Sequence, residues 1–149
     1  PLEAYSWEIP EGGGDVSESP FEAMRRELAE EAGLAAQIWE PLAFFHTSNS
    51  STEEEAFLFL ATELSPVDGH QAEDDEELLL HHEPFQDCLR RVLAGQITDS
   101  LTVVALLALQ SRRTGVVAAL DPTLAERFFQ RPQEHPSAGR ARWQALDAP

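Results

Sequence analysis

A run of glycines followed closely by a helix with marked ends constrains the fold of this chain more than any other stretch. Positions 12–14 are all glycine, which is typical of a turn. Ser19 suits the N-cap of a helix and Pro20 its first position, while Glu22 stands where a capping box needs it. Gly33 suits the left-handed residue that closes a helix. The sequence therefore predicts a turn, and then a helix that begins at Pro20 and ends before Gly33.

The predicted helix carries a cluster of carboxylates on one side. Glu27, Glu30 and Glu31 are three and four positions apart, a spacing that brings their side chains together on a helix. Like charges so placed destabilise an isolated helix by about 0.2–0.5 kcal/mol per pair, and a bound oxygen-seeking cation such as Mg²⁺ would relieve the repulsion. On the helix alone, a solvated acidic face with Arg25 and Arg26 as partners is an equally good interpretation.

Segments of strand and helix character follow one another along the rest of the chain, which indicates an α/β domain. The predicted strands are residues 5–9, 36–45, 56–64 and 78–80, with a polar loop at 46–55. The further predicted helices are residues 84–93, about 101–112 with Ser100 as N-cap, and a short one at 121–129. We expect residues 1–113 to form one domain, and residues 114–149 to form a C-terminal extension with a short helix and a poorly ordered tail.

The charge and the cysteine content exclude several classes of function. A net charge of −17 argues against binding a nucleic-acid backbone or an anionic membrane, and most of the acidic residues fit a solvated surface. All ten cationic residues are Arg, which excludes lysine nucleophiles and Schiff bases. The single Cys88 cannot form a disulfide within the chain, so we expect a cytoplasmic protein.

The glycine turn and the acidic helix together resemble the Nudix box. Gly12 is followed after five residues by Glu18, and after seven more by Arg-Glu-Leu-Ala-Glu-Glu-Ala-Gly-Leu at residues 26–34. Every fixed position of that signature is met, so the resemblance is specific. It implies a loop–helix–loop that binds a divalent metal and a diphosphate, with Mg²⁺ as the cofactor and Mn²⁺ as a possible replacement.

The resemblance also implies roles for the residues of the box. Its metal ligands would be the side chains of Glu27, Glu30 and Glu31 and the backbone carbonyl of Glu11, and Glu31 would also take part in catalysis. Gly12 would let the turn approach the substrate closely. Supporting roles, which orient the ligands rather than touch substrate, would fall to Glu18 and Arg26.

Outside the box, the chain resembles the ADP-ribose pyrophosphatase branch of the Nudix family over roughly residues 1–113. The matching features are Trp7-Glu8-Ile9-Pro10 before the glycines, the acidic run at 73–77 and the sequence from Gly95 to Thr102. This branch implies an α/β/α sandwich with a mixed sheet, and hydrolysis of ADP-ribose or a related nucleotide sugar to a nucleoside monophosphate and a sugar phosphate. By position, the catalytic glutamate would be Glu76, with the other acids of the run as competitors.

Two more residues are candidates for contact with the ribose or the phosphates. Ser48 and Glu54 occupy the loop in which the branch has Ser-Pro-Gly and then a glutamate, although Asn49-Ser50 stands here in place of Pro-Gly. Three histidines could also be considered as ligands or bases, but we interpret them as polar loop or surface residues: His46, His81 and His82.

Only 11 residues precede the box, whereas this branch has several strands there that contribute to the nucleotide site and the dimer contact. We therefore expect a further segment before Pro1, an exposed sheet edge and apolar surface without it, and a homodimer with a shared active site. The expected reaction is Mg²⁺-dependent hydrolysis of ADP-ribose to AMP and ribose 5-phosphate. Alternatives are hydrolysis of GDP-mannose or another nucleotide sugar, and a sensor that binds without cutting. The three intact glutamates favour a hydrolase over a sensor.

Overall fold

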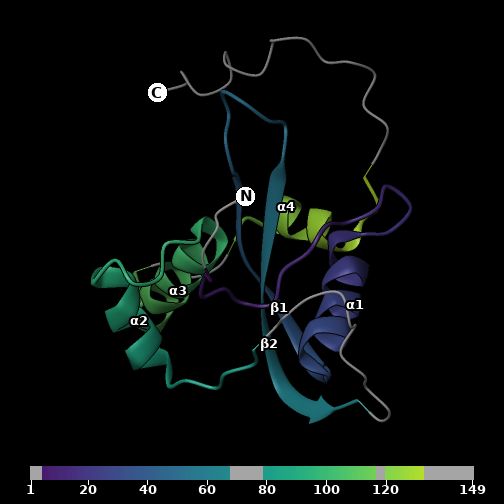
Figure 1. Ribbon diagram of the computed structural model, residues 1–149. Helices are drawn as coiled ribbons and strands as arrows, with labels where there is room; N and C mark the ends of the chain where they lie inside the picture. Colours follow the sequence, from purple (N-terminus) through teal and green to yellow (C-terminus); the bar gives the residue numbers. More distant parts are fainter. Residues whose placement is uncertain (1–4, 68–78, 117–119, 133–149) are drawn as a thin grey trace.

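Two long antiparallel strands form the centre of the computed structural model, which describes residues 5–67, 79–116 and 120–132. In chain order the elements are α1 (Pro20–Ala32), β1 (Leu34–His46), β2 (Glu55–Pro66), α2 (Phe85–Leu93), α3 (Ser100–Arg113), α4 (Pro122–Glu126) and the short 3₁₀ helix η1 (Arg127–Phe129). Helix α1 lies on one side of the strand pair, and α3 lies on the other with α2 packed beside it (Figure 1). The predicted α/β class is confirmed. The strand pairing among the described residues is antiparallel throughout.

The ends of α1 are those predicted from the sequence. The backbone N–H of Glu22 donates to Ser19 Oγ at 3.2 Å, and the backbone N–H of Ser19 donates to the Glu22 carboxylate at 2.8 Å. Gly33 has a φ of 61°, in the left-handed region, and its N–H donates to the carbonyl oxygen of Ala29 at 3.1 Å. The backbone groups at both ends of α1 thus find partners within the helix and its caps.

A bulge in β1 decides which side chains face which helix. The register shifts between Pro41 and Ala43, and a proline, which has no N–H to donate, is tolerated at such a point. After the bulge the side-chain alternation is reversed. Without the bulge, Trp39 and Phe44 would face opposite sides, because one residue number is odd and the other even. With it, both contact phenylalanines of β2 on the side of α1.

Apolar side chains pack on both faces of the strand pair. Towards α3, Leu42 and Leu58 form a buried cluster with Ala105. Towards α1, an aromatic cluster joins four elements through ring contacts; its members are Phe21, Trp39, Phe44, Phe57, Phe59, Phe128 and Phe129. The C-terminal extension thus packs against β2 through residues Phe128 and Phe129.

The structure corrects three local predictions. Residues 5–9 form no strand: the N–H of Ile9 donates to Thr102 Oγ1 of α3 at 3.0 Å instead of to a neighbouring strand. In the predicted strand 78–80, Leu79 and Leu80 are exposed and irregular, and Leu78 lies outside the described residues. The N-cap of α3 is Asp99 rather than Ser100, since the Asp99 carboxylate accepts from Thr102 N at 2.7 Å and places the cap one residue earlier.

Other predicted features fall outside the described residues. These are the acidic run 73–77, including Glu76, and the tail from residue 133. The described helices are all too short or too polar to cross a membrane.

Candidate functional site

Arg26 gathers the acidic groups of the glycine turn and α1 around one guanidinium. Its Nη1 donates to Glu27 at 2.9 Å and to Glu30 at 2.8 Å. Its Nη2 donates to Glu18 at 3.1 Å and to the carbonyl oxygen of Gly13 at 3.0 Å. These hydrogen bonds raise the pKa of Arg26 above its usual value, and the bond to Glu18 has the largest effect. The hydrogen bond from Arg26 also lowers the pKa of Glu18. One cation therefore ties three carboxylates and the turn together.

The glycine turn lies directly against α1. A side chain at Gly12 would overlap the carboxyl group of Glu27, whereas a Cβ at Gly13 would meet nothing within 4 Å. The backbone N–H of Glu11 donates to the Glu31 carboxylate at 3.0 Å. The turn is thus attached to the helix at Glu31 and pressed onto it at Glu27, which brings the backbone of Glu11 beside the carboxylates that the sequence singled out.

The side chain of Glu11 has an environment that the sequence did not reveal. Its pKa is raised to about 7, first by burial and then by the negative charges of Asp99, Glu8, Glu31 and Glu54. Its Oε2 atom is buried without a hydrogen-bond partner. Carboxylate oxygens of Glu8, Glu11 and Asp99 lie within 4.8 Å of one another. Only the carbonyl of Glu11 has a role that the sequence predicts, because residues 11 and 99 are far apart in the chain and come together through the packing of α3.

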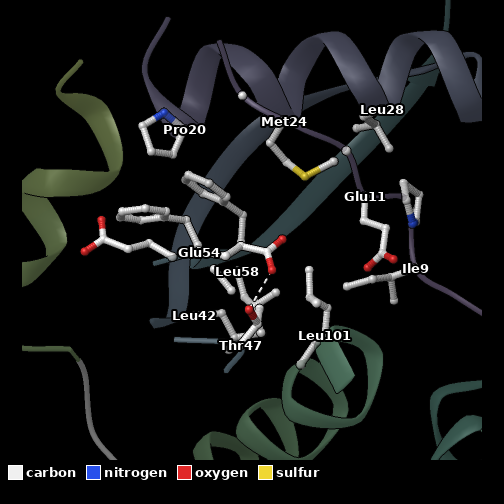
Figure 2. A pocket seen from close by; sticks show the side chains of 18 of the residues that line it. Ile9, Glu11, Pro20, Met24, Leu28, Leu42, Thr47, Glu54, Leu58 and Leu101 are labelled. Atoms are coloured by element: carbon white, nitrogen blue, oxygen red, sulfur yellow. Dashed lines mark hydrogen bonds between the residues drawn. The ribbon is translucent and has the colours of Figure 1, made fainter. Parts of the chain in front are cut away.

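A cavity of about 1270 Å³ adjoins this turn. Figure 2 shows Met24 and Leu28 of α1 above it, Leu101 of α3 below it, and the side chains of Glu11 and Glu54 directed into it. The whole stretch of β2 from residue 55 to residue 61 lines it, together with Gly12, Gly14 and Glu18 of the box. The cavity therefore has an apolar interior and an acidic rim, and the glycine turn is part of its wall.

The loop at residues 47–54 forms another part of the rim. Thr47 Oγ1 donates to the Glu54 carboxylate at 2.6 Å, the bond drawn in Figure 2, and Thr47 N donates to the Glu54 carbonyl at 3.3 Å. Thr47, Asn49 and Thr52 line the cavity with Glu54. Ser48 closes the turn within the loop, where its carbonyl accepts from the N–H groups of Ser51 and Thr52. Of the two predicted loop residues, Glu54 therefore faces the cavity, while Ser48 shapes the loop backbone.

The three histidines lie at the base of the loop or on the surface, as the sequence predicts. His46 Nε2 lies 3.6 Å from Glu55 at the base of the loop. His81 lies 4.0 Å from Glu83, and its ring centroid is 5.6 Å from that of Trp7. His82 is exposed. Thr47, Asn49 and Thr52 line the cavity although no motif in the sequence includes them; all three belong to the predicted polar loop.

The model of the NUDIX domain matches residues 2–96, which is well over half of the chain and includes the glycine turn, α1, both strands and α2. The matched region thus contains Arg26 and the carboxylates around it.

Several characterised proteins are similar to this chain. An ADP-ribose pyrophosphatase of Mycobacterium tuberculosis is 35% identical over 111 residues, covering 73% of this chain and 54% of that protein. An ADP-ribose pyrophosphatase of Bacillus subtilis is 33% identical over 111 residues, covering 74% of this chain and 60% of that protein. A GDP-mannose pyrophosphatase of Cronobacter sakazakii is 31% identical over 97 residues, covering 64% of this chain and 51% of that protein.

The chain spans between about half and three fifths of the length of these relatives. Its matched part contains a complete box whose carboxylates, arginine and glycine turn are assembled in one place. On the domain match and the similarity to the two ADP-ribose pyrophosphatases, this chain belongs to the Nudix family and resembles its ADP-ribose pyrophosphatase branch.

Proposed function

We propose that this protein hydrolyses the pyrophosphate bond of a nucleoside diphosphate sugar with Mg²⁺, and that ADP-ribose, cut to AMP and ribose 5-phosphate, is its substrate. The observation that carries the proposal is that Glu27 and Glu31 contact the glycine turn directly, while Arg26 joins Glu30 to it. The names of two relatives that match about three quarters of this chain support the choice of ADP-ribose.

The donor set fits a hard divalent cation. Glu27, Glu30 and Glu31 provide carboxylate oxygens, and the backbone of Glu11 lies beside them because its N–H is bonded to Glu31. Oxygen ligands of this kind suit Mg²⁺, and Mn²⁺ would be accepted in its place. When bound, the metal would neutralise the diphosphate charge and make water a better nucleophile. Gly12 lies so close to the Glu27 carboxyl group that there is no room for a side chain. The absence of a side chain would also let the turn approach the substrate closely.

The chain's own residues have separate tasks in this reaction. Arg26 and Glu18 keep the carboxylates and the turn in place, and Glu31 both binds the turn and belongs to the catalytic set. Glu54 lies at the rim of the cavity and would accept hydrogen bonds from the ribose of the substrate. Glu76 remains the predicted residue for orienting the attacking water, a step that contributes roughly 10²–10⁴-fold.

A panel of nucleotide sugars tests the substrate. Each would be incubated with the protein in Mg²⁺ or EDTA, and nucleoside monophosphate release would be measured by chromatography. We expect AMP from ADP-ribose in Mg²⁺ only, with no free phosphate. Release of GMP from GDP-mannose instead would favour the second candidate, which the similarity to a GDP-mannose pyrophosphatase supports. Binding of ADP-ribose without turnover of any sugar would favour a sensor.

We also propose that the protein is a cytoplasmic homodimer. Along residues 55–61 the edge of β2 faces the cavity, and no third strand pairs with it in the described part of the chain. Such edges favour association with another chain. Light scattering after size-exclusion chromatography should give twice the mass of one chain, and a monomer at micromolar concentration would contradict the dimer.

A further inference from the structure

We propose that Arg127 is a positioning residue for the loop at residues 47–54, acting through Glu55. The inference deepens the proposed function and rests on it, because the loop is taken to touch the sugar part of the substrate. Arg127 lies about 70 residues beyond that loop, in the C-terminal extension, and past the end of the family match at residue 96.

The segment that carries Arg127 is firmly attached to the fold. Phe128 has no exposed surface, and its ring meets those of Phe57 and Phe59 edge-on, with centroids 5.1 and 5.0 Å away. Asp121 caps α4 by accepting from the N–H groups of Thr123 and Leu124 at 3.0 and 3.2 Å. Because Phe128 is buried against β2, the backbone of its neighbour Arg127 is held in place beside that strand.

From that point Arg127 reaches the base of the loop. Its Nη2 donates to the Glu55 carboxylate at 2.8 Å, and its guanidinium lies 4.6 Å from the ring centroid of Phe44. The other oxygen of Glu55 lies 3.6 Å from His46 Nε2. Since His46 and Glu55 are paired residues at the ends of β1 and β2, the loop begins and ends at this cluster.

A concentration of negative charge at the end of the loop favours a cation at its base. Residues 53–55 are three successive glutamates, and all three line the cavity, where their negative charges repel one another. Arg127 neutralises Glu55, the one that belongs to β2. With Glu55 held, its neighbour Glu54 keeps the direction that brings its carboxylate to Thr47 and into the cavity. The extension thus sets the position of a rim residue that it does not touch.

The test compares four variants of the full chain: Arg127→Gln, Arg127→Lys, Glu55→Gln and the double variant Arg127→Gln/Glu55→Gln. Arg131→Gln is the matched control, because Arg131 lies in the same segment, is exposed, and pairs at 3.7 Å with Glu22 of α1. Two quantities are measured. One is hydrogen exchange of the loop amides without substrate; the other is KM and kcat for ADP-ribose over a range of Mg²⁺ concentrations.

For Arg127→Gln we expect faster exchange in the loop and a KM raised roughly three- to fivefold, with kcat and the Mg²⁺ dependence unchanged. Arg127→Lys should restore part of the KM, since it keeps the charge but not the planar contact with Phe44. The double variant should be no worse than Arg127→Gln alone, and Arg131→Gln should match wild type.

The two measurements separate this inference from the proposed function. Loop exchange in Arg127→Gln equal to that of wild type would overturn the positioning role, whatever the enzyme does. A fall in kcat with unchanged KM would overturn it as well. If wild-type protein cleaved no nucleotide sugar while the loop of Arg127→Gln still exchanged faster, the proposed function would fail and the positioning of the loop by Arg127 would stand.

Discussion

At the scale of single residues, Gly12 shows why a particular residue type is needed at one position of the turn. A Cβ there would overlap the carboxyl group of Glu27, while Gly13 next to it has open space; neither has a left-handed φ. We expect Gly12→Ala to lower the free energy of unfolding by about 1–2 kcal/mol and to impair turnover, because the Glu27 carboxyl group must swing away from the turn and give up its hydrogen bond to Arg26. Gly13→Ala is the control and should change stability by less than about 1 kcal/mol. Urea unfolding of both variants measures this, and equal losses would contradict it.

Glu11 leads to a prediction on pH. Its folded-state pKa of about 7 exceeds the ordinary value of 4.5, so the folded protein favours the protonated form. The stability that follows is present below pH 4.5 and is lost as the pH rises through 7. In EDTA, wild-type protein should therefore lose about 1–2 kcal/mol more between pH 5 and pH 8 than Glu11→Gln, a figure reduced for partial exposure. Parallel pH curves from urea unfolding would contradict this.

At the scale of elements, α1 depends on one arginine to hold its acidic side together. Arg26 contacts Glu18, Glu27 and Glu30, whereas its neighbour Arg25 is exposed and lies over the ring of Phe21. Arg26→Gln should lower stability by about 1 kcal/mol in EDTA, and by less in Mg²⁺, because a bound cation would offset the same repulsion. Arg25→Gln should show no such dependence on Mg²⁺. Thermal unfolding in the two buffers measures the difference, and an Arg26→Gln loss that Mg²⁺ leaves unchanged is the contrary result.

The elements also show what the sequence can predict. The ends of α1 were predicted to the residue because capping is a local interaction between Ser19, Glu22 and Gly33. Residues 5–9 have a strand-like composition, yet a strand exists only if another strand accepts its hydrogen bonds, and Ile9 bonds to a side chain of α3 instead. Asp99 rather than Ser100 caps α3, since both residue types suit a cap and only the backbone geometry selects between them.

Within the candidate site, the sequence predicts which side chains lie near one another only where they belong to the same helix. The carboxylates of α1 share a side because residues three and four apart always do. The contacts of Arg26 with Glu18 and Gly13 also fall within a single short segment. The surroundings of Glu11, by contrast, depend on Asp99 and Glu54, which only the packing of α3 and the loop brings near. No pattern along the chain encodes such distant pairs.

At the scale of the whole molecule, the C-terminal extension connects α1 to β2. Phe128 is fully buried against β2, and Phe129 contacts Phe21 of α1 with a centroid distance of 5.1 Å. We expect Phe128→Ala to lower the free energy of unfolding by about 3–5 kcal/mol, as for other large buried aromatics. Phe129→Ala should have a clearly smaller effect because that side chain is 48% exposed. Urea unfolding of the two variants decides it, and the reverse order of losses would show that the extension is not anchored at Phe128.

The proposed hydrolysis of a nucleotide sugar depends on a metal ion that the acidic side of α1 would bind. Its most direct test is kcat for ADP-ribose as a function of Mg²⁺, measured for wild type, Glu30→Gln and Glu126→Gln. The Glu30 side chain is 46% exposed, so its substitution should leave the fold intact, and Glu126 on α4 is an exposed glutamate outside the site. We predict Mg²⁺-dependent release of AMP by wild type and Glu126→Gln, and a fall of at least about 100-fold in Glu30→Gln. A Glu30→Gln protein with the turnover and Mg²⁺ dependence of wild type would contradict the claim.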